Sequence, residues 1–172
     1  MTERIDPPAH APEKATLIAF LDYYRASLII KTGGLTDEQA RTASVPPSDL
    51  NLMGLVRHMA EVERNWFQRW FIKADAPPIF QSKTDRDIDL HPNEADTLSD
   101  TVAIWRREVD RAGEITAAAD LDELALRVGT SPHWLGFRPS MRWILVHMIE
   151  EYARHCGHAD LIREAIDGTT GD

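Results

Sequence analysis

Four residues that could bind a metal ion lie close together near the C-terminus: His147, Glu151, His155 and His158. Their segment is predicted to be helical, and at about 100° per residue Glu151 and His155 fall inside its apolar stripe. His147 and His158 fall at the edge of that stripe. A carboxylate on a buried face loses much of its hydration, so Glu151 must be paired or coordinated. A Glu and a His four residues apart can hold one divalent ion, although many such pairs are simple hydrogen-bonded partners.

A third ligand must come from a second helix, because ligands on one helix cannot surround an ion. His58 is the only histidine of the preceding candidate helix, and Leu55 and Val62 flank it on the same face. Taken alone, a histidine at this position is more often a core-edge residue bonded to a carboxylate such as Glu151 than a metal ligand. Its presence beside an inward-facing Glu/His pair favours a shared metal site.

Several other kinds of site are excluded by the residues present. Cys156 is the only cysteine, so the chain can form neither an internal disulfide nor a cysteine-based zinc site. Because Cys156 directly follows His155, its side chain points about 100° away from that histidine, which indicates a core or interface residue. The HExxH motif, its inverted form and a glycine-rich phosphate loop are all missing.

The chain has 172 residues, with 19 Lys and Arg against 28 Asp and Glu, which gives a net charge of −9. Such an acidic chain repels phosphate backbones, so we expect no nucleic-acid partner. The richest basic cluster, at Arg106, Arg107 and Arg111, is interleaved with Glu108 and Asp110 and is typical of a solvated helix face. No run is apolar enough for a membrane span or a signal peptide, so we expect a cytoplasmic protein without a membrane partner.

The pattern of apolar residues predicts one all-α domain over residues 1–172, with residues 1–12 as a flexible tail. Spacings of three and four residues indicate long helices, and no segment alternates like a half-buried strand. The loop of roughly 20 residues after the second helix is long enough to let the second and third helices lie parallel. We therefore expect a four-helix bundle with up-down-down-up topology. The predicted long helices are 13–31, 50–72, 96–119 and 140–166, with a helical turn at 35–40 and loops at 73–94 and 130–139.

The runs Leu52–Phe67 and Ser140–Gly168 resemble the DinB-like superfamily, and the similarity extends over about residues 13–168. The match is closest to an actinobacterial branch related to the N-terminal domain of mycothiol-dependent maleylpyruvate isomerases. The resemblance implies a four-helix bundle whose second and third helices are parallel. It also implies a metal held by one His of the second helix and a pair of residues, four apart, on the last. By position, these ligands are His58, Glu151 and His155.

The resemblance further implies Zn²⁺ or Ni²⁺ as the cofactor and mycothiol or a similar small thiol as a partner. A thiolate at the metal could attack an electrophilic small molecule, which would make the protein a thiol S-transferase in detoxification. Because the chain has no room for the second domain of those isomerases, we expect an activity other than isomerisation. The rival hypothesis is a non-catalytic, metal-binding stress-response protein, and in either case a homodimer is expected.

The other candidate residues have two interpretations each. Arg57, Arg154 or Arg138 could hold an anionic part of the thiol cofactor, or could be ordinary surface cations. The sequence assigns no catalytic residue and leaves the roles of His147 and His158 open. Four tryptophans could line the mouth of a pocket, or could serve core and interface packing: Trp66, Trp70, Trp134 and Trp143.

Overall fold

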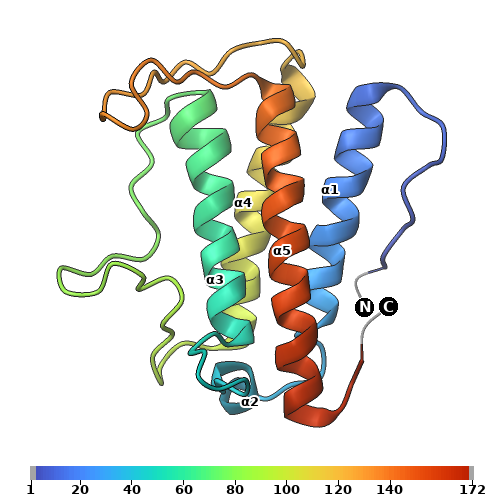
Figure 1. The fold of residues 1–172 in the computed structure, drawn as a ribbon, viewed down its shortest axis with the longest axis vertical. Helices are drawn as coiled ribbons and strands as arrows, with labels where there is room; N and C mark the ends of the chain where they lie inside the picture. The colour runs from blue at the N-terminus through green and yellow to red at the C-terminus, as the bar shows by residue number, and fades with distance from the viewer. Residues whose placement is uncertain (1–2, 171–172) are drawn as a thin grey trace.

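A computed structural model describes residues 3–170 and confirms the prediction of an all-α protein (Figure 1). In this part of the chain the only β-type contact is one antiparallel bridge between Leu124 and Ser140. No helix in residues 3–170 has the length and apolarity needed to cross a membrane. The helices are α1 (Glu13–Ile30), α2 (Asp37–Arg41), α3 (Leu52–Glu63) with its continuation η1 (Arg64–Phe71), α4 (Leu98–Ala118) and α5 (Met141–Asp167).

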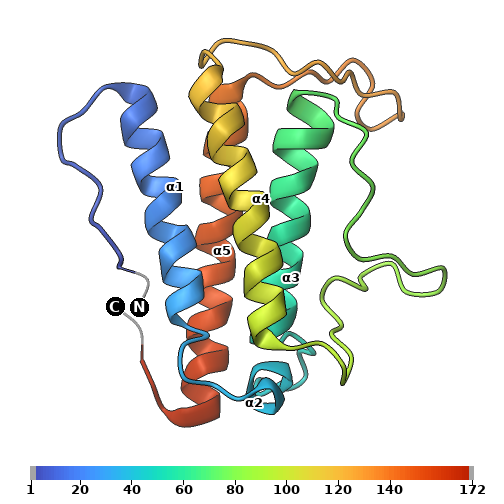
Figure 2. The same ribbon diagram turned by 180° about the vertical axis from the view of Figure 1, so that it is seen from behind.

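The long helices lie side by side, and their directions can be followed in both views (Figures 1 and 2). Helices α1 and α5 run down the page in Figure 1, whereas α3 with η1, and α4, run up it. The segment between η1 and α4 therefore carries the chain back along the molecule before α4 begins. Helix α5 packs against both α1 and α3, and α3 also packs against α4. Ligands carried by α3 and α5 can thus meet.

Polar side chains fix the starts of the helices close to their predicted positions. Asn51, Thr97 and Ser140 each accept a hydrogen bond from a backbone N–H in the first turn, and Thr36 forms a capping box with Gln39. Gly168 ends α5 with a φ of 77°, a conformation that glycine adopts without steric cost. The boundaries of the long helices lie within about two residues of the predicted ones.

The second predicted helix differs from expectation over its last two turns. Residues Arg64–Phe71 form a π-helix, and the N–H of Ile72 continues this pattern by bonding to the carbonyl of Phe67 at 3.3 Å. The wider turn stacks Trp66 on Trp70, with 5.7 Å between ring centroids. π-helical turns inside α-helices occur frequently at functional sites.

The segment between η1 and α4, residues 72–97, is called the crossover segment here, and it is held against α3 by several contacts. Gly54 lies so close to it that a Cβ there would come within 2.3 Å of the carbonyl oxygen of Leu90. The buried guanidinium of Arg57 donates to the carbonyl oxygens of Ile88 and Asp89 and to the carboxylate of Asp96. These contacts hold residues 88–96 against the part of α3 that carries His58.

One polar network crosses the core and joins α1, α3, α4 and α5. Arg25 donates to both carboxylate oxygens of Glu63, at 2.8 and 2.7 Å, and the hydroxyl of Tyr152 donates to the same carboxylate at 2.8 Å. The indole N–H of Trp105 donates to the oxygen of Tyr152 at 2.8 Å. Glu63 and Tyr152 have no exposed surface. Because every member has a partner, the network favours one register of the helices.

One detail of the sequence interpretation changes. Glu108 does not belong to a solvated face, since it is buried and accepts hydrogen bonds from Arg64 and Gln68. Of the predicted tail, residues 1 and 2 lie outside the described part of the chain, and residues 3–12 have no regular structure and lie beside α1 (Figure 1). There the guanidinium of Arg4 lies over the ring of Tyr23.

Candidate metal centre

The structure brings together the three residues that the sequence proposes as ligands. His58 comes from α3, and Glu151 and His155 come from successive turns of α5. One ligand atom from each lies within 4.8 Å of the others. The imidazole rings of His58 and His155 have centroids 4.9 Å apart, and Nε2 of His155 is 3.7 Å from Oε2 of Glu151. The three side chains are 25, 19 and 12% exposed, so the group is sheltered but reachable.

Asp89 orients His58 from the crossover segment. Its Oδ2 lies 2.8 Å from Nδ1 of His58, which leaves Nε2 of that ring free for a ligand. Burial would raise the pKa of Asp89, but the hydrogen bond and charge of His58 outweigh it and hold the pKa below its usual value. A carboxylate behind a ligating histidine is a common arrangement, because it fixes the tautomer and makes the ring more basic. Sequence reasoning missed Asp89, since it lies 31 residues away in a segment without a period.

Removing the carboxylate of Asp89 tests this role. We expect Asp89→Ala to weaken zinc binding about 10- to 100-fold, the usual cost of losing such a partner. Asp89→Asn should lose less, because its amide oxygen can still accept a hydrogen bond from Nδ1. Competition with a chromophoric chelator measures the affinity. Asp87→Ala, in the same segment but exposed, is the control and should bind zinc as the parent does. Equal losses in the Asp87 and Asp89 variants would contradict an orienting role for Asp89.

His155 is held in the form that a metal requires. Burial, followed by the nearby His58, His158 and Arg154, lowers its pKa to about 4. The ring is therefore neutral near pH 7 and has a free lone pair. Two imidazoles and one carboxylate are a donor set that Zn²⁺ accepts, and three protein ligands leave a further position open. The residues present thus fit a divalent ion.

A second group of possible ligands shares Glu151 with the first. Nε2 of His147 is 3.4 Å from Oε1 of Glu151, and Nδ1 of His147 is 3.2 Å from Oε2 of Glu150. This group lies on one helix only, so it cannot surround an ion as ligands from α3 and α5 can. Glu150 is 49% exposed and pairs with Arg154. The first group is therefore the better metal centre.

An aromatic cluster adjoins the ligands. The ring of His147 stacks on Trp143 at 4.9 Å and meets the edge of Trp66 at 4.7 Å between centroids. Trp134 packs against Trp66 and Trp70 from the loop before α5. Trp66 and Trp70 are buried, whereas Trp134 and Trp143 are 36 and 38% exposed. The tryptophans thus pack mainly on one another, and Trp66 and Trp143 join the cluster to His147.

The remaining candidate side chains have partners within the described residues. The guanidinium of Arg57 is buried against the crossover segment, as described above. Arg154 is exposed beside the ligands and pairs with Glu150. Arg138 donates to the carbonyl of Ala125 at 2.7 Å, in the loop before α5. Nδ1 of His158 lies 3.3 Å from Nδ1 of His155, so His158 is next to the metal centre.

Cys156 is not a candidate nucleophile. It is 7% exposed, and burial raises the pKa of its thiol to about 12. Since the thiolate is the reactive form, we expect the native protein to resist a thiol reagent such as dithiobis(nitrobenzoate) at pH 8. One thiol per chain should react once the protein is unfolded in guanidinium. Rapid labelling of the folded protein would contradict the buried position of Cys156.

The fold and site together define an all-α protein with a candidate His/Glu/His metal centre between two helices. The family model for mycothiol-S-transferase matches residues 16–168, and the chain therefore belongs to this family. This finding confirms the predicted DinB-like relationship. A search of curated proteins finds no match to the chain.

Proposed function

We propose that the protein is a divalent-metal-dependent thiol S-transferase that conjugates mycothiol, or a similar small thiol, to an electrophilic small molecule. The observation that carries this proposal is the meeting of His58, Glu151 and His155 from two helices, with ligand atoms within 4.8 Å of one another. Membership of the mycothiol-S-transferase family supports the thiol as the nucleophile. Either Zn²⁺ or Ni²⁺ suits the donor set.

Each residue of the centre has a distinct task in this proposal. A divalent ion bound there would lower the pKa of a coordinating thiol and so supply a thiolate near neutral pH. His58 and His155 would hold the ion as neutral donors, and the charge of Glu151 would leave the centre with a net charge of about +1. Asp89 keeps His58 in the ligating orientation. The S–H proton of the small thiol passes to solvent, its sulfur forms a bond to the electrophilic carbon, and the leaving group departs with the electron pair of the bond that breaks.

The surroundings suggest how the thiol is placed. Arg154 is exposed beside the ligands, so its guanidinium could hold an anionic part of a bound thiol. Arg57, another candidate for this role, is buried and donates to the carbonyl oxygen of Asp89, so it also holds the segment that orients His58. For the fold, we assign the up-down-down-up four-helix bundle, which the parallel course of α3 and α4 in Figures 1 and 2 supports.

A conjugation assay tests the proposal. Zinc-loaded protein is mixed with mycothiol, bacillithiol or glutathione, and with monobromobimane or chlorodinitrobenzene as the electrophile. We expect conjugate to form faster than in the uncatalysed reaction, fastest with mycothiol, and to lose this acceleration after chelation. Metal binding without accelerated conjugation of any of the three thiols would instead support the non-catalytic metal-binding protein.

A further inference from the structure

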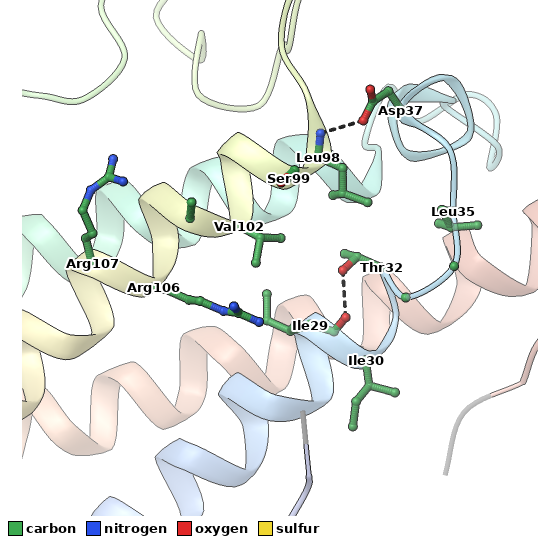
Figure 3. A pocket seen from close by; sticks show the side chains of 13 residues that line it. Ile29, Ile30, Thr32, Leu35, Asp37, Leu98, Ser99, Val102, Arg106 and Arg107 are labelled. Carbon is green, nitrogen blue, oxygen red and sulfur yellow. Dashed lines mark hydrogen bonds between the residues drawn. The ribbon is translucent and has the colours of Figure 1, made fainter. Parts of the chain in front are cut away.

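A wide groove lies on the side of the molecule away from the metal centre. It is formed by the C-terminal end of α1, the turn that follows, and the N-terminal half of α4 (Figure 3). The metal ligands come from α3 and α5, which lie in front in Figure 1, whereas α1 and α4 lie in front in Figure 2. The groove has a volume of about 1330 Å³, which is enough for a small organic ligand.

The middle of the groove is apolar. Ile29 and Ile30 line it from α1, Leu35 from the following turn, and Leu98 and Val102 from α4 (Figure 3). Ile30 is 41% exposed, although it is a large aliphatic residue. The lining therefore leaves apolar surface in water that an aliphatic ligand would cover.

The charges at the groove are not symmetric. Arg106 extends along the groove toward Ile29, whereas Arg107, which also lines the groove, turns away from Ile29 (Figure 3). Within residues 3–170 no acidic side chain lies within ion-pair distance of Arg106. At the other end, Asp37 is engaged, since its Oδ1 accepts a hydrogen bond from the N–H of Leu98 at 2.7 Å. One end of the groove thus offers a cation and the other does not.

From these features we infer that the groove binds a single amphipathic carboxylate, with its carboxylate on Arg106 and its aliphatic chain toward Leu35. An arginine side chain binds a carboxylate through two parallel N–H donors, which gives both strength and orientation. Arg106 lies eight positions after Leu98, a rise of about 12 Å along α4, which suits an aliphatic chain of medium length. The negative end of the ligand is kept away from Asp37 by this orientation. The inference does not depend on the proposed transferase activity.

Calorimetric titration of the zinc-loaded, full-length protein with decanoate tests the inference. We expect saturable binding of one decanoate per chain, and binding about tenfold weaker for octanoate, because two fewer methylenes are buried. Arg106→Gln should weaken binding about tenfold, whereas the matched control Arg107→Gln should change it less than about twofold. Val102→Glu, which places a negative charge in the middle of the groove, should abolish binding.

Three results would overturn the inference. The first is the absence of saturable binding, and the second is an equal loss in the Arg106 and Arg107 variants, which would indicate a general charge effect. The third is a dimer, detected by sedimentation, that dissociates in the Val102→Glu variant. A second copy of the chain would then cover the groove. Zinc content should be the same in all three variants, which separates the groove from the metal centre.

Discussion

Glu151→Gln is expected to weaken zinc binding about 100-fold or more and to abolish thiol conjugation at micromolar zinc. A four-ligand zinc site binds with about 10–16 kcal/mol, so one ligand contributes roughly 3 kcal/mol, which corresponds to a factor above 100. An amide has the shape of the carboxylate but lacks its charge, so it cannot balance the dication. Zinc affinity from chelator competition and conjugation rate should fall together.

Two matched variants separate this centre from the neighbouring group on α5. Glu150→Gln removes an exposed carboxylate next to Glu151 in the sequence. It should leave zinc affinity within about threefold of the parent, since solvent-exposed charges contribute little to binding energy. His147→Ala should also retain the ion, whereas His58→Ala should lose it. The opposite pattern, with the ion lost from His147→Ala and kept by His58→Ala, would assign the metal to the second group.

Glu63→Ala is expected to reduce the free energy of unfolding by about 3–5 kcal/mol, because it leaves the buried guanidinium of Arg25 with only the exposed carboxylate of Asp22 as a counter-charge. That loss is a large part of the roughly 5–15 kcal/mol that stabilises a domain. Tyr152→Phe removes only a hydroxyl and should lose about 1–3 kcal/mol through the unpaired donor of Trp105. Urea unfolding with a chelator present measures both values without a contribution from bound metal.

A double variant checks that charge burial causes the loss. Replacing Arg25 and Glu63 together with Met and Leu removes both charges, so much of the stability lost in Glu63→Ala should return. A double variant as unstable as Glu63→Ala would show that the hydrogen-bond network itself, rather than the unpaired charge, carries the effect.

The helices could be predicted from the sequence because each has a strong local signal. Apolar spacing predicted the bodies of the helices, and their ends lie within about two residues of the predicted bounds, where the structure shows the caps Thr97, Ser140 and Gly168. The π-helical turn at Arg64–Phe71 could not be predicted, since its apolar spacing also fits an α-helix. The buried position of Glu108 was missed for a related reason: its partners Arg64 and Gln68 lie 44 and 40 residues away.

The candidate site was predictable where the helical period sets the geometry. Glu151 and His155 lie on one face of one helix, so their proximity follows from a spacing of four residues. His58 could be added only as the lone histidine of another helix and by the family resemblance. Asp89 could not be found, because its place depends on how the crossover segment packs on Gly54 and Arg57. That packing brings together residues with no periodic relation in the sequence.

X-ray absorption at the zinc edge tests the central claim most directly. For the zinc-loaded protein, we expect nitrogen and oxygen scatterers consistent with two imidazoles and one carboxylate. Addition of mycothiol should add one sulfur scatterer at about 2.3 Å, the usual zinc–thiolate distance. The His58→Ala protein should show no such change. An unchanged spectrum in the parent protein at a mycothiol concentration that supports conjugation would contradict thiol activation at this centre.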